Sequence, residues 1–283
     1  LRCGRPRVAA CGVDFARRRN DGDHDGHRHD RMRHHRRDLV VGDRASAQCG
    51  CADTVEPAVR WQTGGMTTVR RSVVPVLIWG LVLLALGASL GAWISLGHAN
   101  EPFAIDVWWS QLLAPARVEP WLALSYAMNF LGGGWFGVFA VPLGGTLALV
   151  LVKRRWAAMT FLLASAFSAA CVQGAKHLFG RARPQDIIVT TDFGSFPSGH
   201  VANAATIAVV LAIIFPRVWV MVAGGMWVVL MAISRTHLSA HWLSDTAGGA
   251  LIGAGAAFVV AAAFALPLLR ERASRGAAGH VPS

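Results

Sequence analysis

The chain has 283 residues, of which 54% are hydrophobic and 15% are charged, and its formal net charge is +11. This balance excludes an ordinary soluble composition and indicates a polytopic membrane protein. The positive charge does not favour a nucleic-acid partner, because the basic residues lie beside apolar runs and form no aromatic-basic stripe.

The first 65 residues differ in composition from the rest of the chain. The tract DGDHDGHRHDRMRHHRR has no amphipathic period, so residues 1–65 are predicted to be a disordered N-terminal extension. A zinc site is the alternative, since this region also holds most of the cysteines. The spacing matches no usual set of metal ligands, so no metal is expected. The four cysteines concerned are Cys3, Cys11, Cys49 and Cys51.

Six apolar runs follow, each close to the roughly 20 residues that a helix needs to cross a bilayer. They predict an all-α fold, a polytopic membrane helical bundle with about six transmembrane helices. The run that begins at Trp121 is broken by Gly132-Gly133-Gly134, so its first part, to about Phe130, is expected to lie at the membrane interface. The predicted spans are residues 73–96, 135–152, 156–175, 199–215, 218–233 and 246–269.

The membrane domain is expected to occupy residues 66–275, with a short cytoplasmic tail over residues 276–283. Met66 stands before a basic lead into the first span, so it is expected to be the natural start, with residues 1–65 an over-predicted extension.

Lysine and arginine collect mainly on one side of this arrangement, which the positive-inside trend makes the cytoplasmic side. Both termini are therefore predicted to be cytoplasmic, in a multi-pass protein of the plasma membrane. The basic residues on that side are Arg70, Arg71, Lys153, Arg154, Arg155, Arg217, Arg270, Arg272 and Arg275, and those on the outer side are Arg117, Lys176, Arg181, Arg183 and Arg235.

Three polar blocks remain once the spans are set aside: KHLFGRARP (residues 176–184), FPSGH (196–200) and SRTHLSAHWLSD (234–245). Each block begins or ends a span at the outer face. A charge at the centre of a membrane helix costs about 2.5 to 3.5 kcal/mol on insertion scales, so charged groups gathered at the interface around an anion avoid most of that cost. The blocks are predicted to form one extracytoplasmic site.

The charges of these blocks favour a phosphate ligand. Lys176, Arg183 and Arg235 supply three positive groups, and the arginine fork matches phosphate oxygens. Ser198 and Gly199 come directly before an apolar helix, where free N–H groups and the helix dipole favour an anion.

Two histidines and an aspartate are the candidates for chemistry. His241 and Asp245 stand four residues apart, on one face of a helix, so the carboxylate can hold Nδ1–H and leave Nε2 free to attack phosphorus. His200 can supply the general acid. Arg181 is expected only to add positive potential, and His177 and His237 are expected to be interfacial.

Each block also admits a simpler interpretation. Lys176 and Arg183 can be interfacial anchors, PSGH can be a turn with a helix cap, and His241 with Asp245 can be a surface pair. The coincidence of three blocks on one membrane face favours the phosphate site.

The blocks together resemble the type 2 phosphatidic acid phosphatase family, whose pattern is Lys-x6-Arg-Pro, Pro-Ser-Gly-His and Ser-Arg-x5-His-x3-Asp. This resemblance implies hydrolysis of a phosphomonoester or pyrophosphate without metal or cofactor, through a phosphohistidine. His241 would be the nucleophile, Asp245 its orienting partner and His200 the acid and then the base. The groups that would hold the phosphate are Lys176, Arg183, Arg235, Ser198 and Gly199.

The family is related to vanadium-dependent haloperoxidases, which are soluble, so the membrane spans favour a lipid phosphatase. Phosphatidic acid, phosphatidylglycerol phosphate and polyprenyl pyrophosphate all remain open as the lipid phosphate partner, and the sequence does not indicate an oligomeric state. Two alternatives from other classes are a membrane transporter, for which the break at residues 132–134 is the one supporting feature, and a lipid-binding scaffold without activity.

Overall fold

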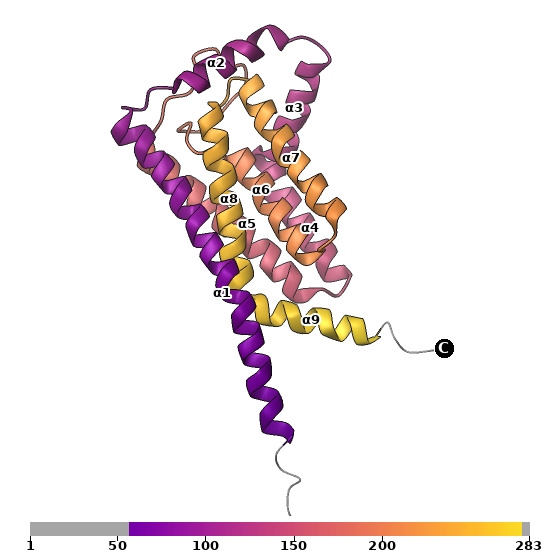
Figure 1. Ribbon diagram of the computed structural model, residues 1–283. Helices are drawn as coiled ribbons and strands as arrows, with labels where there is room; N and C mark the ends of the chain where they lie inside the picture. Colours follow the sequence, from indigo (N-terminus) through magenta and orange to yellow (C-terminus); the bar gives the residue numbers. More distant parts are fainter. Residues whose placement is uncertain (1–56, 279–283) are drawn as a thin grey trace, which may run out of the picture. The chain divides into compact units, whose positions relative to one another are not determined.

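The computed structural model describes residues 57–278, and side-chain surroundings for residues 73–275. Every regular element in this range is a helix, as predicted, and all of them belong to the unit Asp53–Ser283. The α-helices are α1 (Pro57–Ala92), α2 (Ala104–Leu113), α3 (Trp121–Gly132), α4 (Val141–Leu151), α5 (Arg155–Phe179), α6 (Gly199–Ile214), α7 (Val218–His237), α8 (Leu243–Ala263) and α9 (Ala265–Ala278) (Figure 1). Three short helical segments join them: η1 (Trp93–Gly97), η2 (Ala114–Ala116) and η3 (Phe136–Ala140).

The predicted extension and tail fall mostly beyond this range. Residues 1–56 and 279–283 lie outside the described residues, while residues 57–65 begin α1 and residues 276–278 end α9.

All six predicted spans are helical. Four helical stretches are long and apolar enough to cross a membrane, namely Val73–Gly97, α5, α7 and α8. A fifth span results if α3 and the helix Phe136–Leu151 are taken together, although the pair is bent by 49°. Helix α6 is apolar but has only 16 residues.

The segment expected to lie at the interface, to about Phe130, forms α3, and the glycines at 132–134 bend the chain between α3 and the helix Phe136–Leu151. One boundary differs from the prediction. The last span, predicted to reach Leu269, stops at Ala263. Pro267 explains this end, because its ring would clash with the carbonyl of Ala263 in a continued helix.

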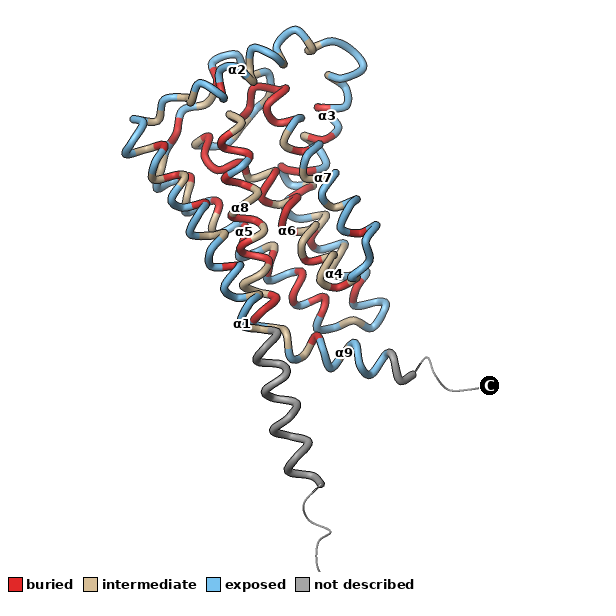
Figure 2. Tube along the Cα trace, viewed as in Figure 1, coloured by how far each residue is buried: buried red, intermediate tan, exposed pale blue. Residues whose placement is uncertain are grey.

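The centre of the bundle consists of α5, α6 and α8, where Figure 2 shows most of the buried backbone. Small residues permit close helix approach here. A Cβ at Gly253 of α8 would lie 2.1 Å from the carbonyl oxygen of Ala202 in α6, and one at Gly249 would lie 2.4 Å from that of Ser198. The N-termini of α6 and α8 are thereby brought together, and the Ser198 N–H donates to the carbonyl of Asp245 at 3.0 Å.

The outer helices present large apolar side chains to their surroundings. Trp79 of α1, Leu147 of α4 and Trp219 of α7 are 62%, 58% and 64% exposed. A lipid bilayer can cover such faces without the cost that water would impose.

Candidate functional site

The three polar blocks meet at one end of the bundle, the end over which α2 lies and which is opposite α9 (Figure 1). Lys176 stands in the last turn of α5, which ends at Gly180 in the left-handed conformation (φ 53°). Arg235 stands in the last turn of α7, and Asp245 in the first turn of α8. His241 lies in the short connection between those two helices.

A cavity of about 320 Å³ opens among these residues. Lys176, His200, Arg235 and His241 all line it, together with the backbone of Gly199. Five of the eight predicted site residues therefore face one space, which is large enough for a phosphate group. Arg183, Ser198 and Asp245 do not line it.

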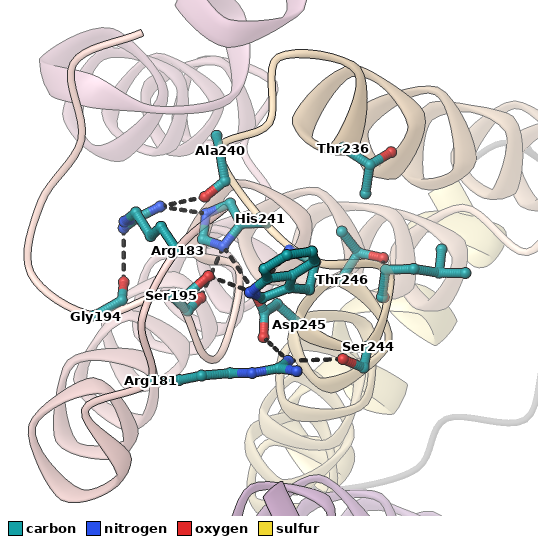
Figure 3. Close-up of polar contacts among 12 residues, drawn as sticks. Arg181, Arg183, Gly194, Ser195, Thr236, Ala240, His241, Ser244, Asp245 and Thr246 are labelled. Atoms are coloured by element: carbon teal, nitrogen blue, oxygen red, sulfur yellow. Dashed lines mark hydrogen bonds and ion pairs between the residues drawn. The ribbon is translucent and has the colours of Figure 1, made fainter. Parts of the chain in front are cut away.

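His241 is held in a defined orientation inside the protein, where its side chain is 3% exposed (Figure 3). Its Nδ1 lies 2.7 Å from the backbone oxygen of Ser195, and its Nε2 lies 3.3 Å from Nη1 of Arg183. A carbonyl oxygen only accepts hydrogen bonds, so Nδ1 carries the proton, and the unprotonated Nε2 accepts from Nη1 of Arg183.

Asp245 acts on His241 in a different way from the direct hydrogen bond that was predicted. Its Oδ2 lies 3.7 Å from Nδ1 of His241, beyond hydrogen-bond distance. This oxygen instead accepts from the Ser195 hydroxyl and from the Trp242 N–H at 2.9 Å. Asp245 thus holds Ser195, and Ser195 holds the imidazole, because the connection after α7 brings the ring closer to the Ser195 carbonyl.

The environment of His241 also sets its protonation. Burial, and after it the positive charges of Arg235, Arg183 and Lys176, lowers the pKa of His241 well below its ordinary value of 6.5. The imidazole is therefore neutral at neutral pH, which is the state that a nucleophile requires.

Arg181 forms two fully buried ion pairs, one with Asp245 and one with Asp106. The Arg181 guanidinium donates to Oδ1 of Asp245 at 2.7 Å and to Oδ2 of Asp106, in α2, at 3.0 Å. Asp106 also accepts from the backbone N–H and the hydroxyl of Ser244 at 2.8 and 2.7 Å. Arg181 is thus a positioning element, a larger role than the general positive potential expected from the sequence.

The roles of Asp106, Ser195 and Asn129 in the site were not predicted from the sequence. Asp106 is 138 residues from its partner Ser244, and no local pattern connects the two. Ser195 contacts His241 through its backbone carbonyl, which any residue possesses. Of the residues in this network, Arg181 could have been found from the sequence, since it lies within the first polar block.

The predicted phosphate-binding groups differ in how many of their donors are engaged. Arg235 donates through Nη1 to Oδ1 of Asn129 in α3, and its Nε has no hydrogen-bond partner among the described residues. The hydroxyl of Ser198, fully buried before the first turn of α6, likewise has no partner within residues 57–278. Arg235 lines the cavity and its Nε is available to an anion there, whereas Ser198 does not line it. Lys176 and Arg183 already contact the loop that precedes α6.

His200 packs against the glycine-rich bend between α3 and η3. Its Nε2 lies 3.1 Å from the carbonyl oxygen of Asn129, and a Cβ on Gly133 would lie 2.1 Å from Cε1 and Nε2 of the ring. The bend, which sequence analysis left as a possible transporter feature, is the wall against which His200 lies.

His177 and His237 lie apart from the cavity. His237, expected at the interface, is buried between hydrogen-bond partners Ser125 Oγ at 2.8 Å and Ala116 O at 3.0 Å. His177 is exposed and stacks on Phe193. Among the residues that the structure describes, no group of three or more His, Cys, Asp or Glu side chains is placed to hold a metal ion.

Comparison with known proteins assigns the family. The PAP2 superfamily profile matches residues 157–266, which include all three blocks. An undecaprenyl-diphosphatase from Sulfolobus acidocaldarius is 30% identical over 191 residues, covering 64% of this chain and 88% of the relative. The chain belongs to the PAP2 superfamily. This membership bears out the prediction of a membrane lipid phosphatase and gives no support to a transporter or an inactive scaffold.

Other PAP2 relatives agree with this assignment. Phosphatidylglycerophosphatase B from Bacillus subtilis is 27% identical over 168 residues, covering 55% of this chain and 81% of the relative. The crystal structure of a transmembrane PAP2-type phosphatidylglycerolphosphate phosphatase from the same species superimposes with a TM-score of 0.55 at 23% identity, over 64% of this chain and 93% of that one. This second likeness establishes the shared fold.

Gly133→Ala should lower the turnover of a lipid phosphate by about 100-fold, because the added methyl group pushes the His200 ring out of position. Gly144→Ala is the matched control, since a Cβ at this helical position of α4 meets nothing within 4 Å. Steady-state phosphate release by both purified variants measures the effect. Equal activity of the two would contradict the role given to the glycine bend.

Proposed function

We propose that this PAP2 protein hydrolyses a lipid phosphate through a phosphohistidine formed on His241. The observation that carries the proposal is the orientation of that ring: Nδ1–H is fixed by Ser195, and the unprotonated Nε2 faces a cavity lined by cationic groups. A neutral imidazole so placed can attack phosphorus without first losing a proton.

In the proposed reaction, Nε2 of His241 forms a bond to phosphorus while the bond to the lipid oxygen breaks. Lys176, Arg183 and Arg235 hold the equatorial oxygens, where negative charge develops in the transition state. The Ser198 hydroxyl and the Gly199 N–H complete this set at the N-terminus of α6.

His200 is proposed to move the protons. The negative charge of the bound phosphate favours the protonated form of His200, which gives its proton to the departing lipid oxygen. Neutral His200 then takes a proton from the water that attacks the phosphohistidine. Phosphate leaves, and His241 returns to its starting state. Asp245 stays paired with Arg181 throughout.

The substrate is proposed to carry a long apolar chain. A second cavity of about 780 Å³ lies between α3, α6 and α7 and shares Gly132 and Asn203 with the phosphate cavity. Most of its lining is apolar, including Trp219 and Trp227. A lipid can therefore place its phosphate beside His241 and its chain along α6 and α7.

The names of the relatives indicate the range of head groups. They are an undecaprenyl-diphosphatase, a phosphatidylglycerophosphatase and a lipid A 4′-phosphatase from Bacteroides thetaiotaomicron, all of which act on phosphates borne by lipids. We propose that this protein takes a monophosphate or diphosphate from the same class. Turnover measured on a panel of polyprenyl and glycerolipid phosphates would rank these substrates.

His241→Ala should reduce phosphate release from the best lipid of that panel by about 10⁴-fold or more, as expected on removal of a nucleophile. Chelators should leave wild-type turnover unchanged, and orthovanadate should inhibit it. His177→Ala is the matched control, because this exposed histidine contacts Phe193 and none of the cavity groups. Retained turnover in His241→Ala, or loss of activity with chelators, would contradict the proposed mechanism.

The site is proposed to open on the outer face of the plasma membrane, with both termini in the cytoplasm, on the basis of the lysine and arginine distribution. In a background without the five native cysteines, a cysteine at exposed Gln185 should react with an impermeant maleimide in intact cells. A cysteine at Ser274 of α9 should react only after permeabilisation. The reverse labelling pattern would show that the protein has the opposite orientation in the membrane.

A further inference from the structure

The loop between Pro184 and Phe196 carries a carboxylate that lies against the phosphate-binding cations. Oδ1 of Asp192 is 3.1 Å from Nζ of Lys176 and 2.9 Å from Nη2 of Arg183. Asp192 also lines the same cavity as His200 and His241. An anion of the protein itself thus occupies the part of the site where these two cations would bind a phosphate oxygen.

Lys176 has too few N–H donors to bind a phosphate while all of its present contacts remain. Its ammonium group has three N–H donors, and the three acceptors around it are Oδ1 of Asp192 and the carbonyls of Phe193 and Gly194. No donor is left over for a phosphate. One of the three acceptors must leave before Lys176 can bind substrate.

Arg183 has five N–H donors, and its two terminal nitrogens are engaged in a similar way. Its Nη2 contacts the carbonyl and Oδ1 of Asp192 and the carbonyl of Gly194, while Nη1 donates to the carbonyl of Ala240. The side chain of Asp192 is the acceptor that can leave at least cost, because it is 56% exposed and water can replace its lost contacts. The carbonyls of Phe193 and Gly194 can move only with the backbone.

We propose that Asp192 is an internal competitor for the phosphate position, and that it weakens the binding of phosphate anions to the free enzyme. This inference rests on the proposed function. The competition acts on free phosphate and on the lipid head group alike. Only the lipid also gains binding energy from its chain in the apolar cavity, so free phosphate leaves the site and lipid phosphate still enters it.

The test is equilibrium binding of inorganic orthophosphate to the purified full chain in detergent, measured by calorimetry. Asp192→Asn keeps the shape of the side chain and removes its charge, so phosphate should bind roughly tenfold more tightly, which corresponds to the loss of a partly exposed charge pair. Asp192→Ala should also bind phosphate more tightly than the wild type does. Inhibition of lipid turnover by phosphate should strengthen by the same factor.

Asp186→Asn is the matched control, because this second carboxylate of the loop pairs with Arg117 at 2.8 Å and does not line the cavity. Its phosphate affinity should equal that of the wild type. Unchanged or weaker phosphate binding by both Asp192 variants would overturn the inference, since Asp192 would then be holding the cations in place. Phosphate binding needs no turnover, so wild-type hydrolysis of lipid phosphates tests the proposed function separately.

Discussion

Asp245 connects all three polar blocks of this protein through its carboxylate and its backbone oxygen. Arg181 of the first block donates to it, and so does the hydroxyl of Ser195, which precedes the second. Within the third block it accepts the N–H of Trp242, beside His241, while its own backbone oxygen accepts the N–H of Ser198. The position of the imidazole and the start of α6 both depend on this one residue.

A buried carboxylate is costly, and the structure offsets that cost with fixed partners. Moving an ion from water into a protein costs several kcal/mol even after relaxation, and pairs recover this only with good geometry and further hydrogen bonds. Asp245 has both, and it stands in the first turn of α8, where the helix dipole favours a negative charge. Arg181 in turn bridges to Asp106, which ties the outer helix α2 to the same network.

The parts of this arrangement that are local in sequence could be predicted. The apolar runs predicted every span as a helix, and the positions of the blocks at helix ends predicted that Lys176, His200 and His241 would share one face. Contacts that depend on how the loop before α6 folds back were beyond prediction. The placement of Ser195 between Asp245 and His241 is one such contact, and the reach of Asp106 across the bundle is another.

If His241 is the nucleophile, it carries the phosphoryl group during turnover. This can be tested by reaction with a lipid phosphate labelled in its phosphoryl group, stopped in alkali within a single turnover and mapped by mass spectrometry. Label is expected on the peptide containing His241 in the wild type and not in His241→Ala. Label on another residue, or turnover by the wild type with no labelled protein at any time point, would contradict it.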